Sequence, residues 1–306
     1  MKQFLITLSI FIFSLCIICE IVIRILRLVP DVPERYINEY GIQRYKPNQS
    51  GYYTKAKTKW EVNNYGWLGT HDVKKDSTIS IIGDSYIENI MNPIDCNQGR
   101  ILKEYLPDYG FFEAGRSGVS FIEAMEISKV LNIEIIPKLQ LIYLSTNDFY
   151  ESISEIKRHT DMLQISLSKN NILRAHLKSP GLKKVLYNIK FLYYLYLKYP
   201  VFVDNHNKGE IKNSDTEIIK YDDFMINELL KYCSDNYELK KIIFVFHPRT
   251  DVRIIETVKI YGIKTIVLND ANDESWILGN HDGHWSCYGH HQVGQQVGMY
   301  LYEYLK

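Results

Sequence analysis

The sequence lacks an excess of charge of either sign, because its 306 residues include 36 Lys or Arg and 36 Asp or Glu. Without net charge there is no overall field to steer the chain onto nucleic acid, so we expect no nucleic-acid partner. Cysteine is scarce too, and five residues are too few for a disulfide framework in a chain of this length. Only Cys96, Cys233 and Cys287 lie beyond the apolar N-terminus, and this odd number argues against a disulfide-stabilised exterior domain.

The N-terminus, in contrast, is rich in apolar residues. No charge interrupts the chain from Phe4 to Cys19, and the apolar stretch continues to Val29 with only three charged residues. A stretch of this length can cross a bilayer as a helix. A cleaved signal peptide is the alternative, but no small-residue cleavage site follows the stretch. We therefore predict a transmembrane anchor over residues 1–29.

The charges that flank this stretch bear on its orientation. Lys2 precedes it, whereas Arg24, Arg27 and Arg35 lie at or beyond its end. The positive-inside rule then favours a cytoplasmic body, but long domains are translocated regardless of flanking charge. These residues leave the side of the membrane open.

Strand-like and helix-like stretches alternate beyond an extended approach segment at residues 30–77. Apolar runs predict four buried strands at residues 78–82, 139–144, 241–246 and 264–268. Helix-like stretches lie at residues 121–131, 222–233 and 288–305. This alternation predicts an α/β fold over residues 78–306, with a parallel sheet between two helical layers. Ligands of such folds bind beyond the carboxyl ends of the strands.

Residues 151–220 are predicted to be a helical insertion in this domain. From Asn171 to Tyr199 the chain has six basic residues and no acidic one. An amphipathic pattern between Pro180 and Pro200 predicts one helix with lysines away from its apolar face. A helix of this kind can lie on a membrane, cover a cleft or dock on the core. We favour docking, because most amphipathic helices are packing elements.

Three loops carry polar residues at predicted strand ends or between glycines. Ser85, in Gly83-Asp84-Ser85, would be exposed on a tight strand-to-helix turn, although either polar residue of this turn could merely cap a helix. The loop that ends at Gly118 can point backbone N–H groups into a site, or be an ordinary turn. Asn147 can donate to a developing oxyanion, although Asn-Asp is also common in turns. A Gly-x-Ser-x-Gly segment is absent from the sequence, which excludes the α/β-hydrolase elbow.

Four histidines lie close together near the C-terminus, between Asn280 and His291. Their spacing matches no structural zinc pattern, so we expect no metal. The competing interpretation makes His284 a general base whose tautomer and positive charge are stabilised by Asp282.

Taken together and in chain order, the three loops and the C-terminal histidine segment resemble the sequence blocks of the SGNH (GDSL-like) hydrolase superfamily. The resemblance covers residues 60–306. The matches are Gly83-Asp84-Ser85, Gly118, Asn147 and a shortened block at residues 282–285, Asp-Gly-His-Trp. Ser145 replaces the glycine expected two residues before Asn147. The Asp-x-His-Trp form is similar to the branch with alginate-type polysaccharide O-acetyltransferases. The segment Asn63–Trp67 is similar to the Asn-x-x-Gly lead-in of membrane-anchored bacterial members.

The resemblance implies a flavodoxin-like sandwich and acyl transfer through a covalent intermediate. Its catalytic residues would be Ser85 as nucleophile, His284 as base and Asp282 as the group that orients the base. The backbone N–H groups of Ser85 and Gly118 and the Asn147 amide would form the oxyanion hole. No cofactor is expected. The substrate would be an acyl ester, most simply an acetyl ester of a cell-surface carbohydrate, and we place the domain outside the cytoplasm.

Water as acceptor makes such a protein an esterase, and a sugar hydroxyl makes it an O-acyltransferase; the motifs serve both. Three rival hypotheses stay open. One is a glycan-binding protein without catalysis, the second a metallohydrolase built on His281, His284 and His290, and the third a membrane-anchored scaffold.

Tyrosine is abundant, with 24 residues. Five of them fall in the predicted helix of the insertion, and Tyr86, Tyr150 and Tyr288 flank the proposed chemistry. Since tyrosine combines an apolar ring with a polar tip, we expect these residues to line a cleft for sugar rings.

Overall fold

The computed structural model describes residues 1–199, 223–279 and 282–306. Its centre is a sheet of five parallel strands in the order β11-β10-β7-β5-β6. Counted along the chain from the β6 edge this order is 2-1-3-4-5, which is the flavodoxin-like arrangement. The strands are β5 (Thr78–Gly83), β6 (Gly110–Gly115), β7 (Leu139–Leu144), β10 (Ile242–Phe246) and β11 (Lys264–Val267). The predicted parallel α/β sandwich is confirmed.

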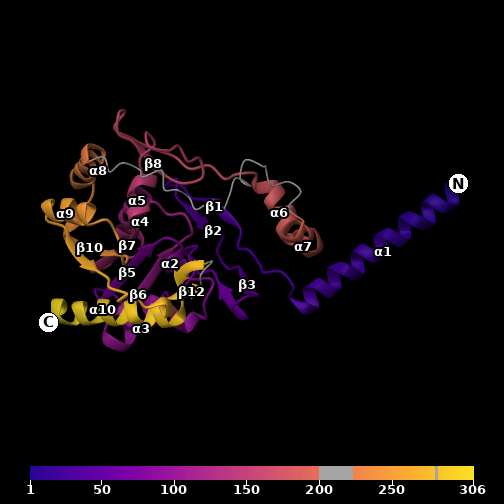
Figure 1. Ribbon diagram of the computed structural model, residues 1–306, viewed down its shortest axis with the longest axis horizontal. Coiled ribbons are helices and arrows are strands. Elements are labelled where there is room, and N and C mark those ends of the chain that lie inside the picture. Colours follow the sequence, from indigo (N-terminus) through magenta and orange to yellow (C-terminus); the bar gives the residue numbers. More distant parts are fainter. Residues whose placement is uncertain (200–222, 280–281) are drawn as a thin grey trace.

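Helices cover both faces of this sheet (Figure 1). One face carries α4 (Phe121–Glu134), α5 (Thr146–Glu151), α8 (Asp223–Asn236) and α9 (Val252–Ile260), and the other carries α3 (Gln98–Tyr105) and α10 (Cys287–Leu305). Because side chains alternate along a strand, each strand serves both layers. In β10, Phe244 and Phe246 pack under the first layer, whereas Ile243 and Val245 pack under the second.

The predicted strands agree with β5, β7, β10 and β11 to within one residue at either end. Strand β6 was not predicted, and the segment from Glu113 to Gly115, expected in a loop, belongs to it. The reason is Glu113, a fully buried carboxylate that interrupts the apolar run. Its oxygens accept hydrogen bonds from the backbone N–H groups of Thr70 and, at 3.0 Å, Gly99. The hydrophobic pattern of a sequence does not show that a buried polar side chain receives hydrogen bonds from backbone groups elsewhere in the chain.

Residues 30–77 contain two hairpins and then run along the free edge of β6. The hairpins are β1 (Arg35–Ile37) with β2 (Gln43–Tyr45), and β3 (Ser50–Tyr53) with β4 (Thr58–Glu61). Isolated antiparallel bridges join Leu68 to Gly115 and His71 to Phe112, and Trp67 is fully buried. This segment therefore shields an edge that would otherwise expose unpaired backbone groups.

The remaining elements are short. They are α2 (Ser85–Glu88), η1 (Ile94–Cys96), β8 (Gln164–Ser166), β9 (Asn171–Leu173), η3 (Leu239–Lys241), η4 (Glu274–Trp276), β12 (Ile277–Gly279) and β13 (Asp282–Trp285). Strands β8 and β9 pair with each other, as do β12 and β13.

Helix α1 (Lys2–Leu26) extends away from the domain (Figure 1). It is long and apolar enough to cross a membrane, with a mean hydropathy of 2.7 over its most apolar window. Near its C-terminal end it meets α7 (Lys190–Lys198), where Ile23 and Val29 pack with Tyr193. Helix α6 (Pro180–Asn188) precedes α7.

The prediction of one continuous helix from Pro180 to Pro200 is wrong within its described part, because the chain is extended at Ile189 and a new helix starts there. The Glu20 carboxylate of α1 accepts hydrogen bonds from the backbone N–H groups of Lys190 (3.1 Å) and Phe191 (2.7 Å). These contacts satisfy two donors at the start of α7, as a capping residue would. A contact from a distant residue thus divides a locally continuous pattern; Pro200 itself lies outside the described residues.

Candidate active site

Ser85 lies at the carboxyl end of β5, an inner strand of the sheet. The strand ends at Gly83, Asp84 follows as the N-cap of α2, and Ser85 is the first residue of that helix. The Asp84 carboxylate accepts a hydrogen bond from the backbone N–H of Tyr86 at 3.0 Å. Asp84 therefore supplies the cap, which leaves the Ser85 hydroxyl free for other contacts.

His284 and Asp282 approach Ser85 from β13. The Ser85 hydroxyl lies 2.8 Å from His284 Nε2, and Asp282 Oδ1 lies 2.6 Å from His284 Nδ1. Only one residue separates the two, but alternate residues of a strand point to the same face. The shortened spacing is therefore compatible with contact between them. The hydrogen bond with His284 lowers the pKa of Asp282 below its usual value, so this carboxyl is ionised at neutral pH.

Gly118 and Asn147 lie at the carboxyl ends of the strands on either side of β5. Gly118 follows β6 by three residues and Asn147 follows β7 by three, and both strands pair with β5. The φ angle of Gly118 is +78°, which L side chains rarely adopt, and a Cβ built there would meet nothing within 4 Å. Asn147 is exposed in the first turn of α5. Ser85 thus lies between two potential hydrogen-bond donors at one sheet edge.

Ser145, which stands where the resembled family has glycine, caps α5. Its backbone N–H and hydroxyl both donate to Asp148 Oδ2, at 2.6 and 2.9 Å. Its φ is −114°, an ordinary extended value, so the position does not need glycine. The capping box fixes the first turn of α5 and hence the backbone that carries Asn147.

Two carboxyl groups close to Ser85 and Asn147 in the chain are shielded from water, since Asp148 is buried and Asp84 is half-buried. Burial raises the pKa of Asp84 to about 6, and burial followed by the charge of Asp84 raises the pKa of Asp148 well above its usual value. Since both shifts favour the protonated form, this pair carries less negative charge near Ser85 than two free carboxylates would.

An aromatic cluster supports the strand that carries His284. The Tyr86 ring lies 4.4 Å from the His247 ring and 4.7 Å from the Trp285 ring, centroid to centroid. The Tyr86 hydroxyl donates to the backbone oxygen of Gly283 at 3.0 Å. Burial lowers the pKa of His247 to about 3, so it stays neutral and does not oppose a positive charge on His284. The position of His247 directly after β10 does not by itself indicate this role.

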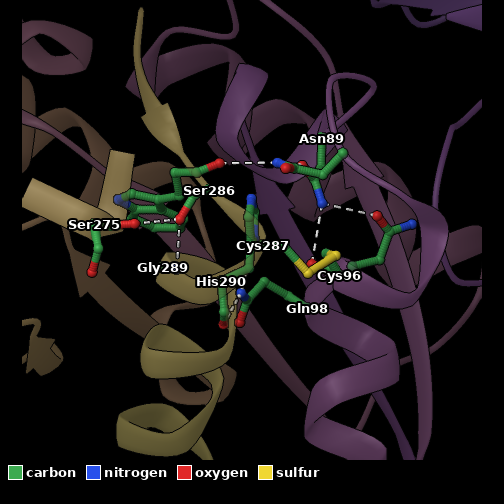
Figure 2. The surroundings of a disulfide bond; sticks show 11 residues. Asn89, Cys96, Gln98, Ser275, Ser286, Cys287, Gly289 and His290 are labelled. Carbon is green, nitrogen blue, oxygen red and sulfur yellow. Dashed lines mark hydrogen bonds between the residues drawn. A yellow bond between two sulfur atoms is a disulfide. The ribbon is translucent and has the colours of Figure 1, made fainter. Parts of the chain in front are cut away.

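Among the described C-terminal histidines, His290 takes part in other contacts. His290 is buried, and Gln98 Nε2 donates to its backbone oxygen at 2.9 Å and lies 3.1 Å from its Nδ1 (Figure 2). Across residues 1–199, 223–279 and 282–306, no group of three or more His, Cys, Asp or Glu side chains is arranged to hold a metal ion. His281, which the metallohydrolase hypothesis needs, lies outside this part of the chain.

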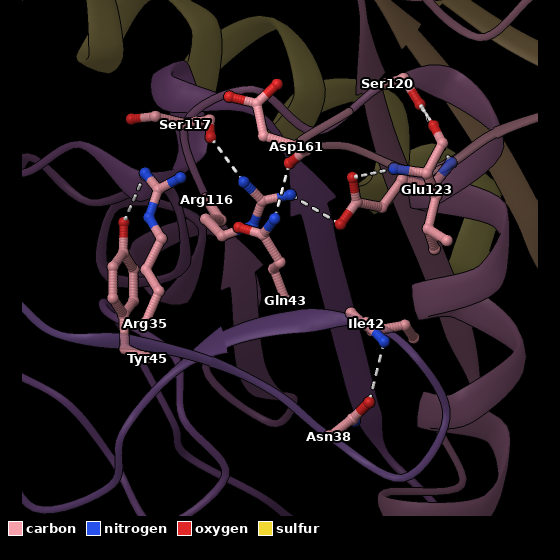
Figure 3. A network of polar contacts seen from close by, with 11 residues as sticks. Arg35, Asn38, Ile42, Gln43, Tyr45, Arg116, Ser117, Ser120, Glu123 and Asp161 are labelled. Atoms are coloured by element: carbon pink, nitrogen blue, oxygen red, sulfur yellow. Dashed lines mark hydrogen bonds and ion pairs between the residues drawn. The ribbon is translucent and has the colours of Figure 1, made fainter. Parts of the chain in front are cut away.

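Glu88 links α2 to the loop that carries Gly118. Its buried carboxylate accepts hydrogen bonds from the Ser117 hydroxyl and from the Tyr45 hydroxyl of β2. Arg35 donates to the Tyr45 hydroxyl from the other side at 3.4 Å (Figure 3). The sequence motifs did not predict these contacts, because the residues lie far apart in the chain and their side chains meet only in the fold.

A buried ion pair holds the same loop from its other side. Arg116 donates to Glu123 at 2.6 Å and to the backbone oxygen of Ser117 at 2.8 Å, and both charged side chains are almost fully buried (Figure 3). Glu123 also accepts from the backbone N–H of Leu163 at 3.2 Å. The loop before Gly118 is therefore fixed by two carboxylates, Glu88 and Glu123.

The structure contains a Cys96–Cys287 disulfide, which corrects the expectation drawn from the odd cysteine count. The third cysteine, Cys233, is free and buried in the core. The number is therefore odd because one cysteine is a core residue and the other two form the disulfide. The bond joins η1 to the first turn of α10, three residues beyond His284 (Figure 2). Asn89 Nδ2 donates to the backbone oxygen of Cys96 at 3.1 Å. The segment after Ser85 is thus cross-linked to the segment after His284.

The tyrosines that flank the site in sequence have different surroundings. Tyr150 is 5% exposed and belongs to the core, so it cannot line an open cleft. Tyr86 is engaged in the aromatic cluster, whereas Tyr288 is 47% exposed. The predicted tyrosine-lined cleft is therefore wrong for Tyr150.

No family model matches this chain, and no curated protein matches it. Among solved structures, it is similar to a lipase/acylhydrolase from Enterococcus faecalis (15% identity, 74% of this chain and 96% of that one, TM-score 0.40). It is also similar to the psychrotrophic esterase EstA from Pseudoalteromonas sp. (11% identity, 75% of this chain and 98% of that one, TM-score 0.41). A third similar structure is a family two carbohydrate esterase from Clostridium thermocellum in complex with cellohexaose (13% identity, 79% of this chain and 68% of that one, TM-score 0.40). The proposals below rest on the chain's own geometry.

Proposed function

We propose that this protein is a membrane-anchored, serine-dependent ester hydrolase or O-acyltransferase. The observation that carries the proposal is the hydrogen-bonded series Ser85–His284–Asp282, with contacts of 2.8 and 2.6 Å, at the carboxyl end of the inner strand β5. A serine hydroxyl is a weak nucleophile until a neighbouring base accepts its proton, and the base in turn needs a group that orients it.

The reaction would begin when His284 Nε2 accepts the Ser85 proton as Ser85 Oγ attacks the ester carbonyl carbon. The oxygen of the tetrahedral intermediate becomes negatively charged, and the N–H groups of Ser85 and Gly118 and the Asn147 amide would donate to it. One such donor typically contributes about 3 kcal/mol to lowering the barrier. His284 then donates its proton to the leaving alkoxide, and Ser85 stays acylated. Water or a sugar hydroxyl, deprotonated by His284, releases the acyl group and regenerates Ser85.

We further propose that the substrate is a short acyl ester, an acetyl ester in the simplest case, on a carbohydrate outside the cytoplasm. The side chains of His284 and Asp282 are 31% and 37% exposed, so the site is open enough for an ester carried on a bulky polymer. The Cys96–Cys287 disulfide supports an extracytoplasmic domain, because disulfides persist in oxidising compartments. Helix α1 would be the single-pass anchor, without a cleavage step.

The test uses the full chain in detergent and a chromogenic acetyl ester. Ser85→Ala should abolish turnover and labelling by a serine-reactive phosphonate, while the control Ser234→Ala, at an exposed position of α8, should retain both. Intact-protein mass spectrometry should show an acetyl adduct on the wild type that candidate glycans discharge if the protein is a transferase. Unchanged labelling of the Ser85→Ala variant would refute Ser85 as the nucleophile, whereas wild-type protein without turnover or labelling would favour a binding protein without catalysis.

A further inference from the structure

Helices α6 and α7 expose their apolar side chains in two stripes. On α6 and its C-cap these are Leu182, Val185 and Ile189, and on α7 and its C-cap Leu192, Tyr196 and Tyr199. Their exposed fractions run from 40% for Ile189 to 71% for Leu182. Residues three and four apart share one face of a helix, so each set is a continuous stripe. Apolar patches of this kind usually mark a surface that another body covers.

The same two helices carry an excess of positive charge. Lys183, Lys184 and Lys198 are exposed, and residues 171–199 contain no acidic side chain. Lys190, in contrast, is buried and paired with Asp31 at 2.7 Å. Exposed lysines beside apolar and tyrosine side chains match the chemistry of a bilayer surface with anionic headgroups.

Contacts with α1 determine where this surface lies. Glu20 accepts the two N–H groups at the start of α7, and Arg24 donates to the backbone oxygen of Asn188 at 2.6 Å, at the end of α6. The uncharged run of α1 ends at Cys19. The 16 uncharged residues from Phe4 to Cys19 rise about 24 Å as a helix, and the residues before them complete a hydrocarbon core of about 30 Å if Lys2 extends its amine to the opposite surface. Glu20 would then lie at the membrane–water interface. The junction of α6 and α7 must then lie at the same level.

We propose that residues 180–199 form an interfacial collar that lies on the bilayer. The apolar stripes enter the headgroup region, and Lys183, Lys184 and Lys198 contact anionic phospholipid headgroups. This inference rests on the proposed membrane anchor, because only an inserted α1 brings the collar to the bilayer. A soluble protein partner could also cover the apolar stripes. It would not explain why the junction of α6 and α7 lies beside Glu20, at the membrane–water interface.

Photocrosslinking from single positions of the full chain tests the collar. Benzoylphenylalanine replaces Leu192 in the collar, Phe11 in α1 or the exposed Ile260 on α9, and each protein is reconstituted in nanodiscs of phosphatidylcholine with phosphatidylglycerol. Phe11 and Leu192 should give lipid adducts by mass spectrometry, and Ile260 should give none. Adducts at Phe11 but none at Leu192 would overturn the collar alone. No adduct at Phe11 would overturn the proposed anchor and the collar with it.

The role of charge is tested by substitution of the lysines. The variant Lys183→Gln, Lys184→Gln, Lys198→Gln should lower the Leu192 lipid-adduct yield at least about two-fold in phosphatidylglycerol nanodiscs. In nanodiscs of phosphatidylcholine alone this variant should match the unsubstituted collar. The matched control Lys240→Gln, Lys241→Gln, Lys259→Gln removes three lysines outside the collar and should change nothing. Equal losses in both variants, or no loss in either, would refute headgroup recognition.

Discussion

The Ser117 hydroxyl donates a hydrogen bond to the Glu88 carboxylate, which joins the loop before Gly118 to the helix that begins at Ser85. Glu88 also receives the Tyr45 hydroxyl from the edge-covering segment. The proposed nucleophile and one proposed oxyanion donor therefore share a single buried support, and the proposed catalytic geometry would depend on residues that do not contact the substrate.

Glu88→Gln is expected to lower kcat roughly ten-fold or more with little change in KM, because Gln places a donating NH2 group where two hydroxyls donate. Stopped assays with the chromogenic acetyl ester give both constants. Tyr45→Phe is the matched control, since it removes one of the two donors but keeps the carboxylate and should lose less. A rise in KM with unchanged kcat for Glu88→Gln would contradict a positioning role.

Asp282→Asn should reduce kcat by about four orders of magnitude while the protein stays folded, because Asn cannot hold the His284 tautomer in which Nε2 accepts a proton. The variant's Tm, measured alongside its rate, separates a catalytic loss from unfolding. Glu274→Gln, on the neighbouring η4, is the control and should behave as wild type. If Asp282→Asn retained most of its rate, a group other than Asp282 would orient His284.

The double variant Cys96→Ser, Cys287→Ser should lose about 4 kcal/mol of unfolding free energy, because the bond spans 191 residues and restricts the unfolded chain. Urea denaturation of the full chain in detergent gives this value. The double variant should also have a lowered kcat, because the bond joins the segment after Ser85 to the segment after His284. The wild type in excess reductant should match the double variant in both its stability and its kcat. Wild-type protein that reductant leaves unchanged in both respects would show that the bond supports neither the fold nor the site.

Stability should depend on pH through Asp84, whose pKa is raised to about 6 by burial. A carboxyl group with a raised folded-state pKa binds its proton more tightly in the folded state. Its contribution is therefore complete below about pH 4 and is lost as the pH rises through about 6. The expected loss is on the order of 2 kcal/mol.

Asp84→Asn keeps an N-capping side chain and removes the titration. Urea unfolding at pH 5 and pH 7.5 should therefore give a smaller difference for this variant than for the wild type. Equal differences in the two proteins would assign the pH dependence to another group.

The central sheet could be predicted because its inner strands are short apolar runs, each followed by a break such as Gly83 or His247-Pro248. Strand β6 could not, since Glu113 is polar and is satisfied by backbone donors from other segments. The division at Ile189 could not be predicted either, because its cause is Glu20 in a different helix. Local patterns specify elements, whereas partners from distant segments decide where some elements begin and end.

The same division holds for the candidate site. Sequence motifs indicated Ser85, His284 and Asp282, and the geometry places them in one hydrogen-bonded series. The supporting residues gave no sequence signal: Glu88 is an ordinary glutamate until Ser117 and Tyr45 surround it, and His247 is distinguished only by its burial against Tyr86. The expectation that the odd cysteine count argues against a disulfide was also wrong, because a count cannot distinguish a free cysteine in the core from a disulfide-bonded pair.

Ser85 and His284 are 199 residues apart, although their side chains are in contact. At a synthesis rate of 5–20 residues per second, roughly 10 to 40 s separate the appearance of the nucleophile from that of its base. During this interval a nascent chain carries Ser85 without its proposed base. The proposed ester cleavage could therefore begin only after His284 has been synthesised.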